Sequence, residues 1–172
     1  MFDATYVRVD DVVRDADTAL HMAKRGGRNR AVAFEHHMRD AIEQRFKVES
    51  ELTQALAQRQ FEVFFQPIVR LTDLSHAGFE ALVRWKHPTH GYISPAEFVE
   101  IAEESGQIRE LGRQILDMAM QAIGTWHQQG LWQPGWYVSI NVSGGQLVDD
   151  SLLQEIEALQ SRHGVACTDI RL

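Results

Sequence analysis

The chain has little cysteine and no long apolar run. Its single cysteine, Cys167, excludes an internal disulfide and gives no support for a thiolate metal site. No stretch approaches the roughly 18 apolar residues that a membrane helix needs, and the N-terminus lacks a signal-peptide pattern. We therefore expect a reduced, cytoplasmic setting, with any membrane attachment supplied by parts of a longer protein outside this chain.

Positive charge is also scarce. The 172 residues hold 17 Lys and Arg against 24 Asp and Glu, a net charge of −7. Because nucleic-acid binding depends on clustered Lys and Arg, this balance argues against a nucleic-acid polymer as partner. An anionic ligand would need locally placed cations, either metal ions or an arginine such as Arg84.

The patterns that are present alternate between strand and helix, which predicts an α/β fold with parallel strand pairs. Ser94, followed by Pro95 and Glu97, predicts a capping box at the start of a helix, and residues 86–91 read as loop. The expected strands are a short one at 30–34, then 61–70, 76–85, 136–142 and 168–172, and the expected helices are 11–25, 35–60, 95–106, 107–129 and 149–163.

The segment from Gly78 to Trp85 is the most informative. Side chains alternate along a strand, so Glu80, Leu82 and Arg84 share one face, while the other face is an apolar stripe suited to packing under helices. Buried unpaired charge is costly, so an inward face of this kind would need a metal for Glu80 and a phosphate for Arg84. An edge strand with one solvated face explains the same pattern, and the segment alone does not decide between them. The apolar stripe consists of Phe79, Ala81, Val83 and Trp85.

Asn141 ends a predicted strand just before a glycine-rich turn, which is where barrel enzymes place catalytic groups. Its amide oxygen could bind a hard metal ion, or it could cap the loop at Ser143. Gln66 is one polar group in an otherwise apolar strand face. His87 and His90 flank a turn three residues apart, but a pair without a third ligand is weak evidence for zinc.

Four motifs, in order, resemble the EAL domain, the cyclic di-GMP phosphodiesterase of bacterial signalling. They are Phe65-Gln66-Pro67-Ile68, Glu80-Ala81-Leu82-Val83-Arg84-Trp85, Ser94-Pro95-Ala96-Glu97-Phe98 and Asn141-Val142-Ser143. The resemblance implies the first half of a TIM-like (β/α)8 barrel with an antiparallel first strand.

The front of the chain is similar to the last helix and turn of a GGDEF (diguanylate cyclase) domain. The similarity covers Asp15 to Arg30, including Lys24 and the Gly27-Arg28-Asn29 pattern, although His21 replaces the usual tyrosine. Together the two resemblances imply three parts: a GGDEF remnant at 1–34, a linker helix at 35–60 and the front half of an EAL domain at 61–172.

The EAL resemblance also implies chemistry. It makes Glu80 and Asn141 catalytic ligands of Mg²⁺ or Mn²⁺, and it gives Arg84 a phosphate contact. Gln66, Leu82 and Pro95 would belong to the substrate pocket. Hydrolysis would convert cyclic di-GMP to linear pGpG by a two-metal mechanism.

The family's further ligands have no counterpart before the chain ends, so we expect the chain alone to be inactive. We expect a homodimer formed through the EAL part or the linker helix. Two alternatives stay open: a degenerate EAL domain that binds cyclic di-GMP without cleaving it, and a dimerising regulatory module.

Overall fold

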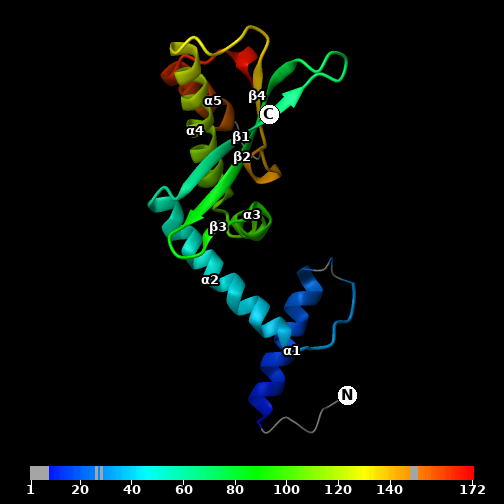
Figure 1. Ribbon diagram of the computed structural model, residues 1–172. Coiled ribbons are helices and arrows are strands. Elements are labelled where there is room, and N and C mark those ends of the chain that lie inside the picture. The colour runs from blue at the N-terminus through cyan, green and yellow to red at the C-terminus, as the bar shows by residue number, and fades with distance from the viewer. Residues whose placement is uncertain (1–7, 26, 28, 148–150) are drawn as a thin grey trace. The chain divides into compact units, whose positions relative to one another are not determined.

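A computed structural model describes residues 8–25, 27, 29–147 and 151–172 (Figure 1). Gly26 and Arg28 of the GGDEF-like turn, and the first two residues of the helix expected at 149–163, lie outside the described residues. The α-helices are α1 (Val9–Arg25), α2 (His37–Ala57), α3 (Pro95–Glu104), α4 (Ile108–Gln128) and α5 (Ser151–His163). The strands are β1 (Phe61–Val69), β2 (His76–His87), β3 (Gly91–Ile93), β4 (Tyr137–Ile140) and β5 (Ile170–Arg171), with short 3-10 helices η1 (Gly144–Gln146) and η2 (Cys167–Asp169).

The chain divides into two compact units, residues 1–50 and 51–172. In the first unit, the buried carboxylate of Asp15 on α1 accepts a hydrogen bond from Arg39 Nε at 2.8 Å. The Arg39 guanidinium also lies over the Phe34 ring, 5.2 Å from its centroid. A buried carboxylate is stable only when it is paired, so this contact fixes α1 against the start of α2.

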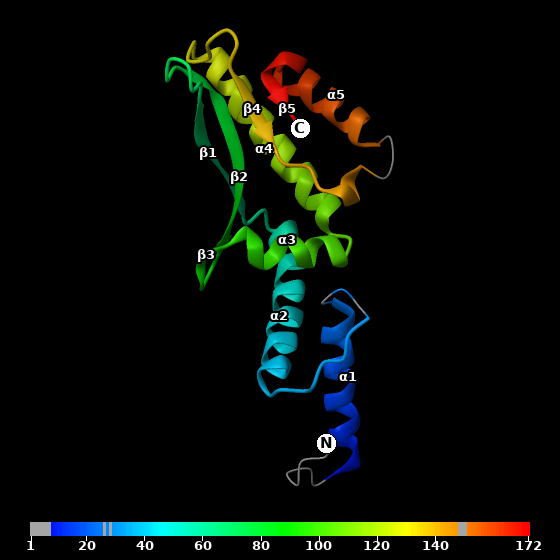
Figure 2. The same ribbon diagram turned by 90° about the vertical axis from the view of Figure 1, so that its right-hand side faces the viewer.

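The second unit contains an open mixed sheet with the strand order β1-β2-β4-β5, and β3 pairs with the far end of β2. β1 runs antiparallel to β2, whereas β2, β4 and β5 are parallel (Figure 2). The expected α/β class and the expected antiparallel first strand are both confirmed. Helical connections between the parallel strands account for the alternation seen in the sequence.

The parallel strands approach closely at Gly78. A Cβ at this position would lie 1.9 Å from the backbone oxygen of Tyr137 on β4, and the glycine has a φ of +153°. Only a residue without a side chain fits there, so Gly78 permits the contact that begins the β2–β4 pairing.

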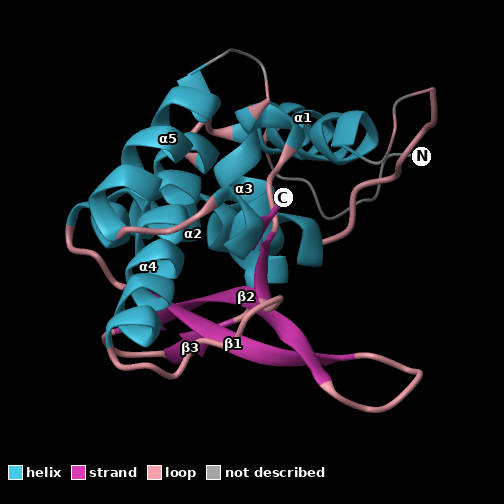
Figure 3. Cartoon of the chain, turned by 90° about the horizontal axis from the view of Figure 1, so that it is seen from above, coloured by secondary structure: helices cyan, strands magenta, loops and turns pink. Residues whose placement is uncertain are grey.

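One face of the sheet is covered by α4 and α5, which lie on the same side of it (Figure 3). Their apolar faces meet Ala81 of β2 and Val138 and Ile140 of β4, and all three are almost completely buried. Farther along β2, Trp85 is fully buried and packs against Phe61 and Phe98, with ring centroids 5.7 and 5.6 Å away. The apolar stripe of β2 therefore packs under helices, as its periodicity predicts.

Three local predictions were wrong. The strand expected at 30–34 is absent, because these described residues pair with no strand and have no regular secondary structure. Lys86 and His87 continue β2, and Gly91 begins β3, which pairs back onto β2; the loop expected at 86–91 is thus a tight hairpin. Ser94 does precede α3, with Pro95 at its first position, but its side chain makes no capping hydrogen bond. The amide of Glu97 is satisfied by the backbone oxygen of Ser94 instead, so the capping box is unnecessary.

No helix in the described part of the chain is both long enough and apolar enough to cross a bilayer.

Candidate active site

The sheet face opposite α4 and α5 brings polar residues into register. β1 places Gln66 directly opposite Glu80, and β4 places Ser139 beside Glu80 on the other side. Neighbouring residues in register have side chains on the same face of the sheet. The pairing therefore brings two of the predicted site residues, Gln66 and Glu80, side by side.

Asn141 follows β4 and completes this arrangement. Its Nδ2 donates a hydrogen bond to Glu80 Oε1 over 2.9 Å, joining residues that are 61 positions apart in the sequence. The oxygen and nitrogen of an amide are exchanged by a simple flip, so the Asn141 oxygen can take the same place. A carboxylate and an amide oxygen that converge in this way are suitable ligands for a hard divalent cation.

A pocket of about 310 Å³ opens beside the Glu80–Asn141 pair. Four predicted site residues line it: Leu82, Arg84, Pro95 and Asn141. Glu80 and Gln66 are not among the lining residues, although Glu80 shares a face of β2 with Leu82 and Arg84. Four of the six predicted residues thus line one pocket. Glu80 is connected to it by the hydrogen bond to Asn141, and Gln66 lies opposite Glu80 on β1.

Arg84 is free of a competing carboxylate. Its guanidinium donates to the backbone oxygen of Val83 over 2.8 Å and lies over the ring of Phe64, 5.6 Å from the centroid. No carboxylate among the described residues forms an ion pair with it. Most donors of the guanidinium are thus available for an anion, as the bidentate recognition of a phosphate requires.

The nearest strand partner of Arg84 is Glu62, which is occupied elsewhere. Tyr92 Oη donates to Glu62 Oε2 over 2.8 Å, and Lys86 Nζ donates to Oε1 over 3.0 Å. These hydrogen bonds, that from Tyr92 first, lower the pKa of the Glu62 carboxyl below its ordinary value. Glu62 therefore stays ionised and bound to its own partners, which leaves Arg84 uncommitted.

Sequence reasoning missed several pocket residues. Val99 and Glu103 on α3 line the pocket together with Pro95. Residues four apart lie on one face of a helix, so the position of Pro95 could have indicated both. Gln146 on η1 also lines the pocket and accepts the backbone N–H of Ser143 at 3.0 Å. No sequence spacing indicates that contribution, because it depends on how the loop after Asn141 folds back.

The sequence model of the EAL domain matches residues 49–172 of this chain, which is the whole second unit and most of the sequence. The chain belongs to the EAL family. The match does not extend to residues 1–48.

Curated relatives match more of the chain. A bifunctional diguanylate cyclase/cyclic di-GMP phosphodiesterase, MucR of Pseudomonas aeruginosa, is 32% identical over 155 residues, covering 90% of this chain and 22% of that protein. The cyclic di-GMP phosphodiesterase NbdA of the same organism is 33% identical over 163 residues, covering 95% of this chain and 21% of its own length. The chain thus spans about a fifth of the length of these relatives.

Solved EAL structures share the fold. The MucR phosphodiesterase in complex with c-di-GMP superposes with a TM-score of 0.67 at 31% identity, over 72% of this chain and 49% of that one. The EAL enzyme Bd1971, solved with cAMP and cyclic di-GMP bound, gives a TM-score of 0.69 at 27% identity, over 97% of this chain and 43% of its own.

Proposed function

We propose that the EAL unit is part of a phosphodiesterase that hydrolyses cyclic di-GMP to linear pGpG in bacterial second-messenger signalling. The observation that carries the proposal is the hydrogen bond between Glu80 and Asn141, because it brings two hard ligands together beside a pocket lined by Arg84. The EAL relatives named as phosphodiesterases, and a relative solved with c-di-GMP, support the choice of substrate.

Glu80 and Asn141 would hold Mg²⁺ or Mn²⁺, and their adjacent oxygen-bearing groups fit such an ion. When bound, divalent cations supply Lewis acidity and a reactive water for phosphodiester hydrolysis. The Asn141 amide would turn its oxygen toward the cation, beside the carboxylate of Glu80. Arg84 would hold a phosphate oxygen, with its guanidinium already oriented by Phe64 and by the Val83 carbonyl.

The remaining site residues would shape the substrate pocket. Leu82 and Pro95 offer apolar contacts on the pocket wall, which suit the faces of a nucleobase. Gln66 would hydrogen-bond the ligand from β1, since it lies opposite Glu80 and is exposed.

We further propose that the open sheet is the first half of a (β/α)8 barrel. Phe64 on the open face is 46% exposed, and β5 pairs on one side with β4 only. A closed barrel would cover both features, so residues 1–172 should self-associate as a homodimer through the EAL unit or α2.

The metal site of residues 1–172 is also incomplete, because two ligands cannot hold two metal ions. We therefore expect residues 1–172 to be inactive alone.

The part before residue 49 fits the tail of a GGDEF domain, which we propose for residues 1–34. The MucR match of 155 residues is longer than the 124 residues from 49 to 172, so it reaches well into this part, and MucR is a bifunctional diguanylate cyclase. Residues 35–60, most of which form α2, would be the linker, and residues 61–172 the EAL part proper. A cytoplasmic location fits the single exposed cysteine.

A degenerate receptor is the second candidate, because binding needs only the pocket and Arg84, whereas hydrolysis needs the complete metal site. The decisive test is hydrolysis of cyclic di-GMP with Mg²⁺ by the longest natural protein that contains this chain, run beside a calorimetric binding measurement. Turnover to pGpG supports the phosphodiesterase. Binding without turnover identifies a receptor, and absence of both overturns the proposed ligand and leaves the dimerising module.

A further inference from the structure

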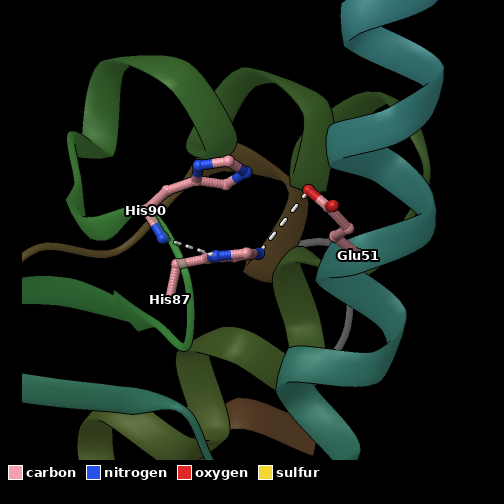
Figure 4. Close-up of side chains that lie close together, drawn as sticks. All are labelled: Glu51, His87 and His90. Carbon is pink, nitrogen blue, oxygen red and sulfur yellow. Dashed lines mark hydrogen bonds and ion pairs between the residues drawn. The ribbon is translucent and has the colours of Figure 1, made fainter.

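Three side chains that can bind a metal meet at the other end of β2, away from Glu80. They are Glu51 on α2, His87 at the end of β2 and His90 in the turn before β3 (Figure 4). One ligand atom from each lies within 4.8 Å of the others, and this is the single cluster of its kind among the described residues. All three belong to the second unit.

The cluster is built into the fold. The imidazole of His87 has a side-chain exposure of only 8%, and its Nε2 lies 3.7 Å from Glu51 Oε2. Its ring packs edge-on against the buried Trp85, with centroids 5.6 Å apart. The His90 ring stacks on His87 with centroids 4.6 Å apart. Packing thus fixes His87, while the exposed His90 keeps the freedom to close over an ion.

We propose that Glu51, His87 and His90 form a binding site for a transition-metal cation, with Zn²⁺ as the best fit. Two imidazoles and one carboxylate are a common ligand set for zinc, and a water completes the tetrahedron. Ligand atoms around Zn²⁺ lie roughly 3.3 Å apart, given metal–ligand bonds of about 2.0–2.1 Å. The His87–Glu51 separation is close to that value, and rotation of His90 supplies the remaining approach.

Protonation decides how His87 can take part. Its Nδ1 lies 3.2 Å from the backbone nitrogens of Thr89 and His90 and from Thr89 Oγ1. Without metal, Nδ1 accepts the two N–H groups, and the ring proton sits on Nε2, facing Glu51. Metal binding moves that proton to Nδ1, where Thr89 Oγ1 can accept it.

This exchange displaces two long backbone hydrogen bonds and releases no net proton from a neutral ring. It lets the Nδ1–H of His87 donate to the Thr89 hydroxyl, and metal-binding histidines normally make such a hydrogen bond with the ring nitrogen that does not bind the metal. The Thr89 hydroxyl therefore belongs to the proposed site as a positioning group. The two imidazole nitrogens favour a transition metal at this site. The oxygen ligands of Glu80 and Asn141 instead suit Mg²⁺ or Mn²⁺.

A bound ion would connect two segments that are distant in the sequence. Glu51 lies near the start of the EAL unit on α2, and His87 ends the strand that carries Glu80 and Arg84. A ligand that binds only the folded arrangement stabilises it in proportion to the logarithm of its concentration. The site would therefore lock the end of β2 to α2 without entering the candidate active site.

The test uses purified residues 1–172 carrying Cys167→Ser, which removes the thiol, and free of affinity-tag histidines. Calorimetric titration with Zn²⁺ should show one site per chain, and Co²⁺ should give the strong visible absorption of tetrahedral coordination. Zn²⁺ should raise the Tm clearly more than Mg²⁺ at the same concentration, because Mg²⁺ disfavours imidazole ligands and has only the Glu80–Asn141 pair to bind.

Three variants locate the site. His90→Ala should weaken Zn²⁺ binding at least tenfold and remove the Co²⁺ absorption, with the metal-free Tm unchanged because His90 is exposed. Glu51→Gln should weaken binding by a similar factor while keeping the shape of the side chain. Thr89→Val should weaken it by a smaller factor. His21→Ala, which removes an exposed histidine from α1, is the matched control and should bind like the parent.

Equal Zn²⁺ affinity in the parent and in His90→Ala would overturn the proposal, as would loss of binding in His21→Ala alone. Binding of one Zn²⁺ per chain without the tetrahedral Co²⁺ absorption would also overturn it, because a different set of ligands would then hold the ion. None of these outcomes depends on whether the chain binds or cleaves cyclic di-GMP.

Discussion

The two faces of β2 have opposite characters within one strand. The face toward the helices carries Ala81 and Trp85, which are 3% and 0% exposed. The other face carries Glu80, Leu82 and Arg84, all partly exposed and adjacent to a pocket or to Asn141. Because successive side chains of a strand point to opposite faces, β2 can pack against the helices with one set of side chains and expose polar side chains for ligand binding with the other.

The two faces of β2 contribute to different free energies, one to folding and the other to ligand binding. Burial of Trp85 among Phe61 and Phe98 contributes to folding through apolar area. Glu80 and Arg84 contribute little to folding, since they keep solvent contact and make few internal bonds. Substitutions on the two faces should therefore separate activity from stability, and the following experiments test that separation.

The largest effect is expected for Glu80→Gln in the longest natural protein that contains the chain. Loss of a ligand carboxylate should lower the rate of cyclic di-GMP hydrolysis at saturating Mg²⁺ by roughly a hundredfold or more. The Tm should stay within a few degrees, because Glu80 makes a single described hydrogen bond.

Glu62→Gln is the matched control on the same sheet face, because Glu62 binds Tyr92 and Lys86 instead of facing the pocket. It should retain most of the rate. If Glu80→Gln kept more than a tenth of the parent rate, Glu80 would not be a metal ligand.

Trp85→Ala tests the helix-facing side. Removing a fully buried indole should lower the free energy of unfolding by about 3–5 kcal/mol in denaturant titrations of residues 1–172. Phe64→Ala, on the open face, should cost clearly less because Phe64 is 46% exposed. Equal losses for the two variants would mean that Phe64 is buried in solution, and would place the proposed self-association on this open face instead of on α2.

Arg84→Ala should weaken cyclic di-GMP binding by roughly tenfold or more, because charged hydrogen bonds to phosphate are lost. Its Tm should change little, since its described contacts are one carbonyl and one ring face. Arg84→Lys restores the charge without the planar fork and should recover only part of the affinity. An unchanged affinity together with a large fall in Tm would assign Arg84 a structural role.

The smallest effect is expected for Tyr92→Phe, which removes the main hydrogen bond that lowers the pKa of Glu62. The Glu62 pKa should rise toward its ordinary value, as measured by NMR titration of its side-chain carboxyl carbon. A carboxyl whose pKa is lower in the folded state stabilises the fold at pH values above its unfolded-state pKa. This stabilisation is lost as the pH falls through the folded-state pKa. The stability difference between parent and variant should thus be small at neutral pH and vanish in acid; a difference that grew in acid would contradict this sign.

The sequence predicted the elements well because their periodicities are local. Each expected strand of the sheet exists, although the last is observed only at Ile170 and Arg171. The short strand β3 was missed because Pro88 and Gly91 signal a turn, and its three residues, Gly91–Ile93, are too few to show an alternating pattern. The observed juxtaposition of Glu80 and Asn141 followed from strand ends and family motifs, not from spacing alone.

Contacts that depend on tertiary packing could not be read in the same way. Glu51 lies on a helix and His87 at a hairpin, and no spacing relates them, so the two histidines looked like a pair without a third ligand. The pocket contribution of Gln146 likewise depends on the path of the chain after Asn141. The roles of Glu80, Asn141, Gln66, Leu82, Arg84 and Pro95 remain predictions that the experiments above address.

The antiparallel pairing of β1 with β2 has a consequence for the order of folding. Its partners are close in sequence, from Val69 with His76 to Phe61 with Trp85, whereas the β2–β4 pairing joins Gly78 to Tyr137. Closing a short loop costs less chain entropy, and hairpins form within microseconds, so this ribbon should assemble before the parallel pairs. Gln66 and Glu80 would then face each other in a nascent chain long before Asn141 leaves the ribosome, and the amide would arrive at a half-site that is already in place.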